Sequence, residues 1–183
     1  MTATVHAFVD ESYRREYLLA ACVVSPSALE TGRKTLRALL RAQDRRLHFK
    51  AMNDQRRRET IARLCDADLR CWVLTGQGKP EDVRQECLRR LVQELLAENA
   101  QRLVLESRGE PDDRKDARTI QRTLGSSPSR TGLVHEHLRP YEDPLLWVPD
   151  AVSWCYGAGA DWRRRAKPLV GRVIDVGAAQ RRA

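Results

Sequence analysis

The chain has 183 residues, and its formal net charge of +8 and pI near 9.7 favour a polyanionic partner such as nucleic acid. Hydrophobic residues make up 42% of the chain and recur at regular spacing, which excludes a disordered chain and predicts one domain over residues 1–183. No apolar run approaches the roughly 18 residues of a transmembrane helix, and no secretory signal is recognisable, so we expect a cytoplasmic protein without a membrane anchor.

The first predicted element is a β-hairpin. Residues 4–10 and 15–24 are apolar strands joined by a short connection at 11–14. We then expect helices over 26–44, 54–65, 80–98, 111–124 and 149–165, and strands over 69–76, 102–107, 132–138 and 169–176. The last segment either closes the sheet or packs as a C-terminal arm. This order predicts an α/β fold whose mixed central sheet starts with the hairpin and has helices on both faces.

Three acidic residues lie where apolar structure would be expected to continue. Asp10 ends the apolar run of the first strand, Glu106 ends the strand RLVLE, and Asp150 opens an apolar helix after PLLWVP. An ionised carboxylate at the edge of a core is costly unless a cation or hydrogen-bond donors compensate its charge. Because the carboxyl ends of adjacent parallel strands share one crevice, we expect Asp10 and Glu106 to point into it together if their strands are such neighbours.

Divalent cations would compensate these acids, although helix capping or pairing with arginine is the alternative. The sequence contains neither a glycine-rich phosphate loop nor a serine-nucleophile elbow, so no motif points to a different chemistry. Mg²⁺ and Mn²⁺ prefer carboxylate and water oxygens, and two such ions ~3.5–4 Å apart stabilise both oxygens in phosphodiester cleavage. Asp150 is suited to stay ionised because the helix dipole favours an anion in the first turn. We therefore expect two Mg²⁺ or Mn²⁺ ions bound by Asp10, Glu106 and Asp150.

Five segments, in this order, resemble the domain of unknown function 3800 family. They are AFVDES (7–12), LHFK (47–50), LVLES (103–107), DDRKDARTIQRTL (112–124) and PLLWVPDAVSW (144–154). The resemblance covers residues 4 to about 176 and implies a ribonuclease H-like fold with a metal-dependent nuclease activity. It matches the family's metal-binding acids to Asp10, Glu106 and Asp150. Two departures are Tyr13, where many relatives have glycine, and Pro149, where many have alanine.

Glu11, His48 and Lys50 have roles that the sequence leaves open. Successive strand side chains point to opposite faces, so Asp10 and Glu11 do not both face one ion unless the strand ends between them. Glu11, the second acid of the DES signature, is expected to serve the catalytic site by binding the ion through water, to hold an arginine or to cap the hairpin. His48 and Lys50 share a side if their segment is extended, where they would contact a phosphate or assist proton transfer; otherwise they belong to an ordinary connection.

The basic run Arg163, Arg164 and Arg165 is the best local candidate for phosphate binding, with a solvated helix end as the alternative. His135 and His137 share a strand face, but they would indicate a metalloenzyme only if another ligand converged on them. We interpret the chain as a metal-dependent nuclease that cleaves phosphodiester bonds in nucleic acid. The alternative is a non-catalytic nucleic-acid-binding or protein-interaction module that retains the fold.

Overall fold

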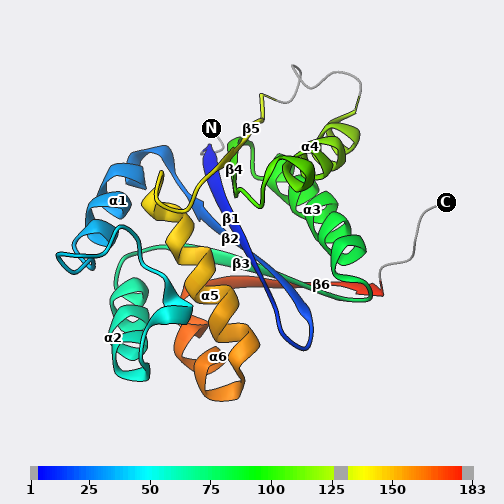
Figure 1. The fold of residues 1–183 in the computed structure, drawn as a ribbon. Helices are drawn as coiled ribbons and strands as arrows, with labels where there is room; N and C mark the ends of the chain where they lie inside the picture. Colours follow the sequence, from blue (N-terminus) through cyan, green and yellow to red (C-terminus); the bar gives the residue numbers. More distant parts are fainter. Residues whose placement is uncertain (1–3, 126–131, 179–183) are drawn as a thin grey trace.

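The computed structural model describes residues 4–125 and 132–178 and shows a six-stranded mixed sheet in the order β5-β4-β1-β2-β3-β6 (Figure 1). The strands are β1 Val5–Tyr13, β2 Tyr17–Val24, β3 Arg70–Gln77, β4 Ala100–Glu106, β5 Val134–Leu138 and β6 Val170–Ala178. β2 is antiparallel to β1 and β3, whereas β1 with β4, β4 with β5 and β3 with β6 are parallel pairs. The predicted mixed sheet with its N-terminal hairpin is confirmed, and the last segment closes the sheet beside β3.

Helices cover both faces of the sheet, as predicted (Figure 1). The helices are α1 Leu29–Arg37, α2 Asp54–Cys65, α3 Pro80–Ala97, α4 Glu110–Leu124, α5 Trp147–Ala158 and α6 Ala160–Ala166. Short 3₁₀ turns are η1 Pro26–Ala28, η2 Phe49–Ala51, η4 Pro144–Leu146 and η5 Lys167–Leu169. α1, α2, α5 and α6 pack on one face, which we call the α5 face, and α3 and α4 pack on the other, the α3 face. No helix among the described residues is long and apolar enough to cross a membrane.

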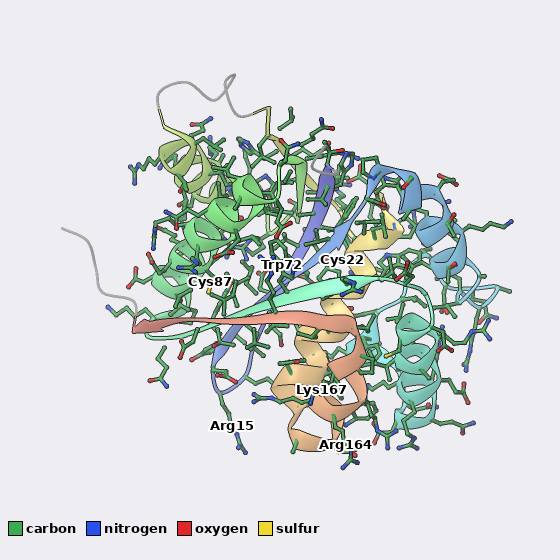
Figure 2. The ribbon with its side chains drawn as sticks, turned by 180° about the vertical axis from the view of Figure 1, so that it is seen from behind. Arg15, Cys22, Trp72, Cys87, Arg164 and Lys167 are labelled. Carbon is green, nitrogen blue, oxygen red and sulfur yellow. The ribbon has the colours of Figure 1, made fainter. Side chains whose placement is uncertain are left out.

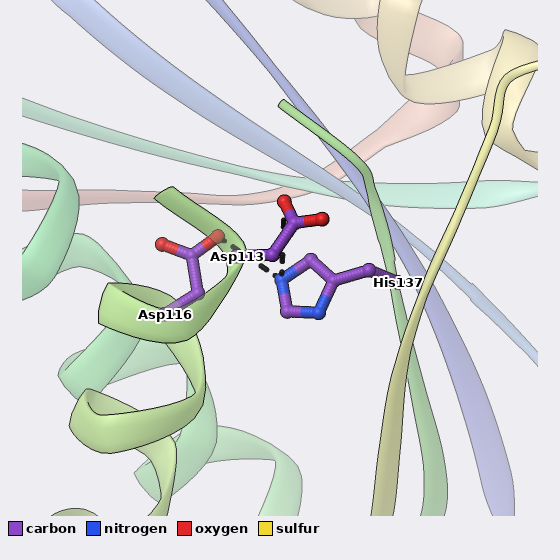
Figure 3. A group of neighbouring side chains, drawn as sticks. All are labelled: Asp113, Asp116 and His137. Carbon is purple, nitrogen blue, oxygen red and sulfur yellow. Dashed lines mark hydrogen bonds and ion pairs between the residues drawn. The ribbon is translucent and has the colours of Figure 1, made fainter. Parts of the chain in front are cut away.

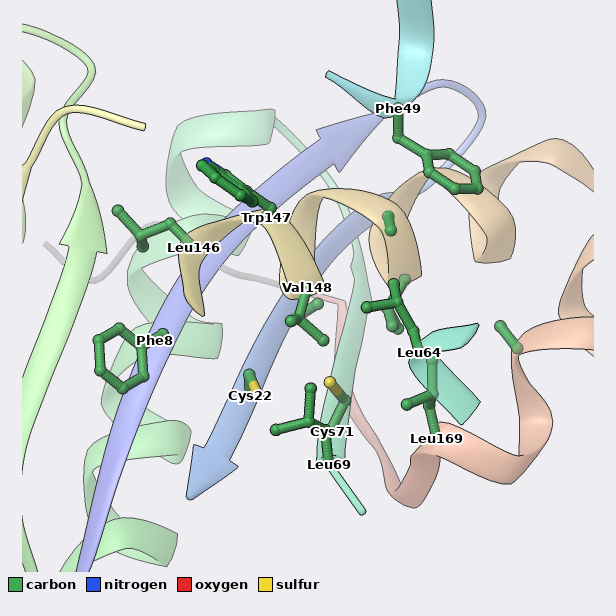
Figure 4. Close-up of a cluster of buried hydrophobic side chains, with 14 of the residues drawn as sticks. Phe8, Cys22, Phe49, Leu64, Leu69, Cys71, Leu146, Trp147, Val148 and Leu169 are labelled. Carbon is green, nitrogen blue, oxygen red and sulfur yellow. The ribbon is translucent and has the colours of Figure 1, made fainter. Parts of the chain in front are cut away.

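Strand alternation divides the core between these two faces. Phe8 and Cys22 point to the α5 face, where Leu146 and Val148 cover them (Figure 4). The neighbouring strand positions point to the α3 face, where Trp72 packs in the same cluster as Cys87 of α3 (Figure 2). Odd and even positions along a strand therefore face different helices, and each side chain lies on either the α5 face or the α3 face.

The hairpin connection differs from the prediction. β1 continues to Tyr13 and the turn occupies residues 14–16, so Asp10 and Glu11 lie within the strand rather than at its end. Asp10 pairs with Ala20 and Glu11 with Leu19 across the hairpin. The apolar side chains of β2 extend the ladder past the acids. As a result, the two acids point to opposite faces of the sheet.

Two predicted helix boundaries are also wrong. α1 ends at Arg37 instead of residue 44, because Asp44 accepts the backbone N–H of Arg41 and pairs with Arg56 of α2, which stabilises a turn in place of further helix. The predicted helix over 149–165 starts at Trp147 and is divided into α5 and α6. The division falls at Gly159, whose φ of +119° is a conformation that glycine adopts readily and other residues rarely do.

Candidate metal centres

Asp10, within β1, and Glu106, the last residue of β4, lie just beyond the last paired residues of these two parallel strands. β1 and β4 are adjacent, and Val9 pairs with Leu105 one residue before each acid. Phe8 and Val104 belong to the core of the α5 face, so alternation directs Asp10 and Glu106 to that same face. The condition that the sequence set for these two acids, neighbouring parallel strands, is met.

Asp150 approaches the same face from the first turn of α5. One oxygen of its carboxylate, Oδ2, accepts the backbone N–H of Phe49 at 3.1 Å, which ties the start of α5 to η2. Its charge acts on both Asp10 and Glu106, so the three acids form one electrostatic unit. We call Asp10, Glu106 and Asp150 the carboxylate centre.

The carboxylate centre has too little positive charge near it. Burial, then the charges of Glu106, Glu11 and Asp150, raise the pKa of Asp10 well above its usual range. Burial and the charge of Asp150 raise the pKa of Glu106 to about 7, and burial raises the pKa of Asp150 against the opposing hydrogen bond from Phe49. Ionising all three acids together is unfavourable, and a bound divalent cation would stabilise their ionised forms.

The segment before η2 supplies the basic residues closest to this centre. Arg46 Nη1 lies 3.8 Å from Glu106 Oε1, and the charges of Arg46 and His48 lower the pKa of Asp150. His48 and Lys50 are both exposed. The segment is not extended throughout, because Phe49–Ala51 forms the 3₁₀ turn. His48 is therefore beside the centre, and Lys50 follows it on the turn that holds Asp150.

Glu11 faces away from the carboxylate centre and holds an arginine, one of the three roles left open for it. Its Oε2 accepts a hydrogen bond of 2.7 Å from Arg84 Nη1, and its Oε1 lies 3.6 Å from Arg108 Nε. Both arginines lie on the α3 face. The two adjacent acids of the DES signature thus belong to two different groups of side chains.

A second group of acids lies on the α3 face and was not identified from the sequence. Asp113, Asp116 and His137 each offer a ligand atom within 4.8 Å of the others, a spacing that can hold a metal ion (Figure 3). Among the described residues this is the one group of three potential ligands that is so tight. The i, i+3 spacing of Asp113 and Asp116 on α4 was the available signal, and it stands within the quoted segment DDRKDARTIQRTL.

Arginines already neutralise this second group. Asp116 is fully buried and accepts from Arg84 Nε and Nη2 at 2.9 and 2.7 Å, from Arg108 Nη2 at 3.2 Å and from His137 at 3.3 Å. Asp113 accepts from Ser107 Oγ and from the backbone N–H of Arg108. We call Glu11, Arg84, Arg108, Asp113, Asp116 and His137 the arginine–carboxylate cluster. A metal ion would have to displace hydrogen bonds that are already made.

The pKa values of the cluster agree with this interpretation. Burial alone would raise the pKa of Asp116, but hydrogen bonds from Arg84 and His137 and the arginine charges hold it well below its usual range. Burial opposes the charge of Arg84, yet the hydrogen bond to Asp116 and the charge of Glu11 raise its pKa. Arg84 and Asp116 therefore stabilise each other's charged form, and the charge of Asp116 is already compensated.

The HEH segment contributes one residue to this cluster. His137 contacts Asp116, whereas His135 is half-buried, and burial and the neighbouring His137 lower its pKa. The additional ligands that a histidine-centred metal site would need do converge on His137. However, Asp116 is committed to the arginines, and the group of potential ligands does not include His135.

Arg163, Arg164 and Arg165 lie on α6, at the end of the molecule where the hairpin turns. Arg163 Nη2 is 2.6 Å from Glu16 Oε1 in that turn, and Arg164 and Arg165 both pair with Asp161. Figure 2 shows the side chain of Arg164 pointing outward at this end, as does that of Arg15. Among the described residues, the ion pairs of these three arginines are with Asp161 and with Glu16 of the hairpin turn, and they include no member of the carboxylate centre.

No protein-family model matches the chain, and no curated protein matches its sequence. Membership of the domain of unknown function 3800 family stays a prediction. The structure supports a mixed six-stranded α/β sheet.

Proposed function

We propose that this protein is a cytoplasmic, Mg²⁺- or Mn²⁺-dependent nuclease with a ribonuclease H-like domain, and that Asp10, Glu106 and Asp150 hold the ions. The observation that carries the proposal is the carboxylate centre itself: three acids from β1, β4 and α5 face one another's charge with one loosely paired arginine to offset it. Carboxylates in this situation either protonate or bind a cation. Mg²⁺ and Mn²⁺ suit an all-oxygen donor set.

The position in the fold also supports the proposal. Ligands of open α/β sheets bind outside the carboxyl ends of parallel strands, and Asp10 and Glu106 lie just beyond the point where the parallel pairing of β1 with β4 ends. When bound, two ions would supply the charge that activates a water nucleophile and stabilises the leaving oxygen. Glu11 would act beside this site by holding β1 to Arg84 rather than as a ligand.

The basic residues would bind the nucleic acid. His48 and Lys50 are exposed next to the centre, where they would contact phosphates or assist proton transfer. Arg163, Arg164 and Arg165 would contribute a more distant phosphate contact, at the cost of their local ion pairs.

Cleavage of labelled RNA, DNA and RNA–DNA hybrid with Mg²⁺ or Mn²⁺ tests the proposal. We expect Asp10→Asn and Glu106→Gln to lower the cleavage rate by at least about 100-fold, because removing an ion-binding charge removes several kcal/mol of transition-state stabilisation. Glu30→Gln, which removes an exposed acid on α1, is the matched control and should cleave like the parent. If the two centre variants cleave as fast as the parent, the assignment is wrong.

The second candidate is a nucleic-acid-binding module that does not cleave, and the net charge of +8 favours it. Binding by such a module would depend on salt but not on divalent ions. Affinity for the same nucleic acids, measured with and without a chelator, separates the two candidates. Chelator-independent binding of a probe that is never cleaved supports the binding module.

A further inference from the structure

Among the described residues, Arg46 is the one basic residue that forms an ion pair with the carboxylate centre. Its Nη1 lies 3.8 Å from Glu106 Oε1, which is longer than a hydrogen bond. The Arg46 side chain is 32% exposed and that of Glu106 20% exposed. The guanidinium thus sits at the mouth of the centre, held by charge and not by directed hydrogen bonds.

Arg84 and Arg33, which also pair with partly or fully buried acids, are held far more firmly than Arg46. Arg84 makes two hydrogen bonds to Asp116 in addition to those to Glu11 and Tyr17, and it is almost fully buried. Arg33 makes a bidentate contact with Asp143. Arg46 makes no such bond to a residue in 4–125 or 132–178, and it lies on the connection between α1 and η2 rather than on a helix or strand. Its contact with Glu106 can therefore be exchanged for another partner.

We propose that Arg46 is a phosphate-binding residue that stays against Glu106 until divalent ions bind, and then turns to the nucleic-acid phosphate. This inference rests on the proposed function. In the metal-free protein Arg46 partly offsets the negative charge of the centre. An ion bound by Glu106 replaces that charge and repels the guanidinium, which gains an anionic partner as soon as a phosphate arrives.

The chemistry of the two groups favours this exchange. A guanidinium presents a planar fork of N–H donors that matches two phosphate oxygens, whereas its contact with Glu106 uses neither oxygen at hydrogen-bonding distance. A phosphate bound to an ion on Glu106 would lie close to Arg46, whose guanidinium is 3.8 Å from Glu106 and partly exposed. Ion and arginine would thus compete before the substrate binds and cooperate afterwards.

Arg46→Ala, compared with Arg45→Ala, tests this proposal. Arg45 is the preceding residue and carries the same charge, but its guanidinium lies over the ring of Tyr141 at 5.4 Å, so its loss controls for the general loss of positive charge. Mn²⁺ affinity is measured by calorimetry. Affinity for a labelled nucleic acid is measured in Ca²⁺, which oxygen ligands also bind, with a gel to show that the probe stays intact.

We expect Arg46→Ala to bind Mn²⁺ about threefold to tenfold more tightly than Arg45→Ala, because a competing charge a few ångströms away is gone. We also expect Arg46→Ala to bind the nucleic acid at least about tenfold more weakly than Arg45→Ala, and Arg46→Lys to recover part of this affinity.

Equal Mn²⁺ affinity or equal nucleic-acid affinity in the two alanine variants would overturn the role of Arg46. Asp10→Asn and Glu106→Gln are titrated with Mn²⁺ in the same series to keep that failure distinct. Undiminished Mn²⁺ binding in these two variants overturns the proposed function itself. A loss of Mn²⁺ binding there, together with matching behaviour of Arg45→Ala and Arg46→Ala, overturns only the inference about Arg46.

Discussion

The carboxylate centre and the arginine–carboxylate cluster lie on opposite faces of the sheet. Adjacent residues of β1 contribute to both, because Asp10 belongs to the centre and Glu11 to the cluster. On the α3 face, Arg84 and Arg108 surround the acids and give every carboxylate oxygen of Asp116 a donor. On the α5 face, the acids have backbone N–H groups and one loose ion pair. The first environment stabilises charge, and the second leaves it uncompensated.

This contrast shows that tight spacing of acids and a need for a cation are separate properties. Asp113, Asp116 and His137 are the tighter group, but the charge of Asp116 is already compensated by Arg84 and Arg108. The acids of the carboxylate centre are more loosely arranged, but burial raises their pKa values, and neighbouring acids raise those of Asp10 and Glu106 further. These differences are why we propose a structural role for the cluster and metal binding for the carboxylate centre.

The largest effect that would sharpen this contrast is expected from Asp116→Asn. It leaves the buried guanidinium of Arg84 without its main partner, and breaking a buried ion pair costs about 3–5 kcal/mol. Urea unfolding with a chelator present measures this loss. Asp150→Asn is the comparison: it removes a charge that the fold does not stabilise and still offers an acceptor to Phe49. If Asp150→Asn destabilises the protein more than Asp116→Asn, the contrast is wrong.

The pH dependence of stability should differ in sign between the two sites. Glu106 has a pKa of about 7 in the folded protein against 4.5 ordinarily, so the folded state holds more protons between these values. Its contribution to stability is therefore present below about pH 4.5 and is lost as the pH rises through 7. The lowered pKa of Asp116 acts oppositely: its contribution is present above about pH 4 and is lost as the pH falls below its ordinary value.

Urea unfolding of the metal-free protein at pH 5 and pH 8 measures the first of these effects. We expect the parent to lose on the order of 2 kcal/mol relative to Glu106→Gln over this interval, since each unit of pKa shift corresponds to about 1.4 kcal/mol. The comparison with Glu106→Gln removes the contributions of the histidines, which both proteins share. Mg²⁺ should abolish the difference. If the free energy of unfolding has the same pH dependence in the parent and in Glu106→Gln, the claim that the charge of Glu106 is uncompensated is wrong.

The smallest effect is expected from His137→Gln. The contact of His137 with Asp116 is a single hydrogen bond of 3.3 Å next to three stronger ones from arginines, so we expect a loss of about 1 kcal/mol. His135→Gln, on the same strand, is the matched control and should cost less. Mn²⁺ affinity should stay unchanged in both variants. A large loss of Mn²⁺ binding in His137→Gln would show that the metal binds on the α3 face instead of at the carboxylate centre.

The sequence predicted the parts of the centre that follow from strand geometry. Apolar runs ending at Asp10 and Glu106 predicted that the two acids meet if their strands are parallel neighbours, and the structure supplies that pairing. The parity argument also separated Glu11 from Asp10 correctly, even though the hairpin turn was placed too early. Local periodicity encodes strand parity, whereas the pairing of β1 with β4 is a tertiary feature.

The partners of the charged side chains were not predictable in the same way. Asp150 accepts the N–H of Phe49, which is 101 residues away, and Arg84 joins Glu11 to Asp116 across three elements. Arg84 appears in the sequence as an ordinary polar position of a helix, because long-range packing alone decides that it is buried. The chain has many arginines, and only its tertiary packing determines which acid each of them contacts.

Mn²⁺ titration followed by electron paramagnetic resonance tests the central claim most directly. The parent is compared with a variant carrying Asp10→Asn and Glu106→Gln and with one carrying Asp113→Asn and His137→Gln, after circular dichroism has shown that each is folded. We predict that the first variant loses Mn²⁺ binding and that the second binds like the parent. Loss of binding in the second variant alone would contradict the assignment of the metal to Asp10, Glu106 and Asp150.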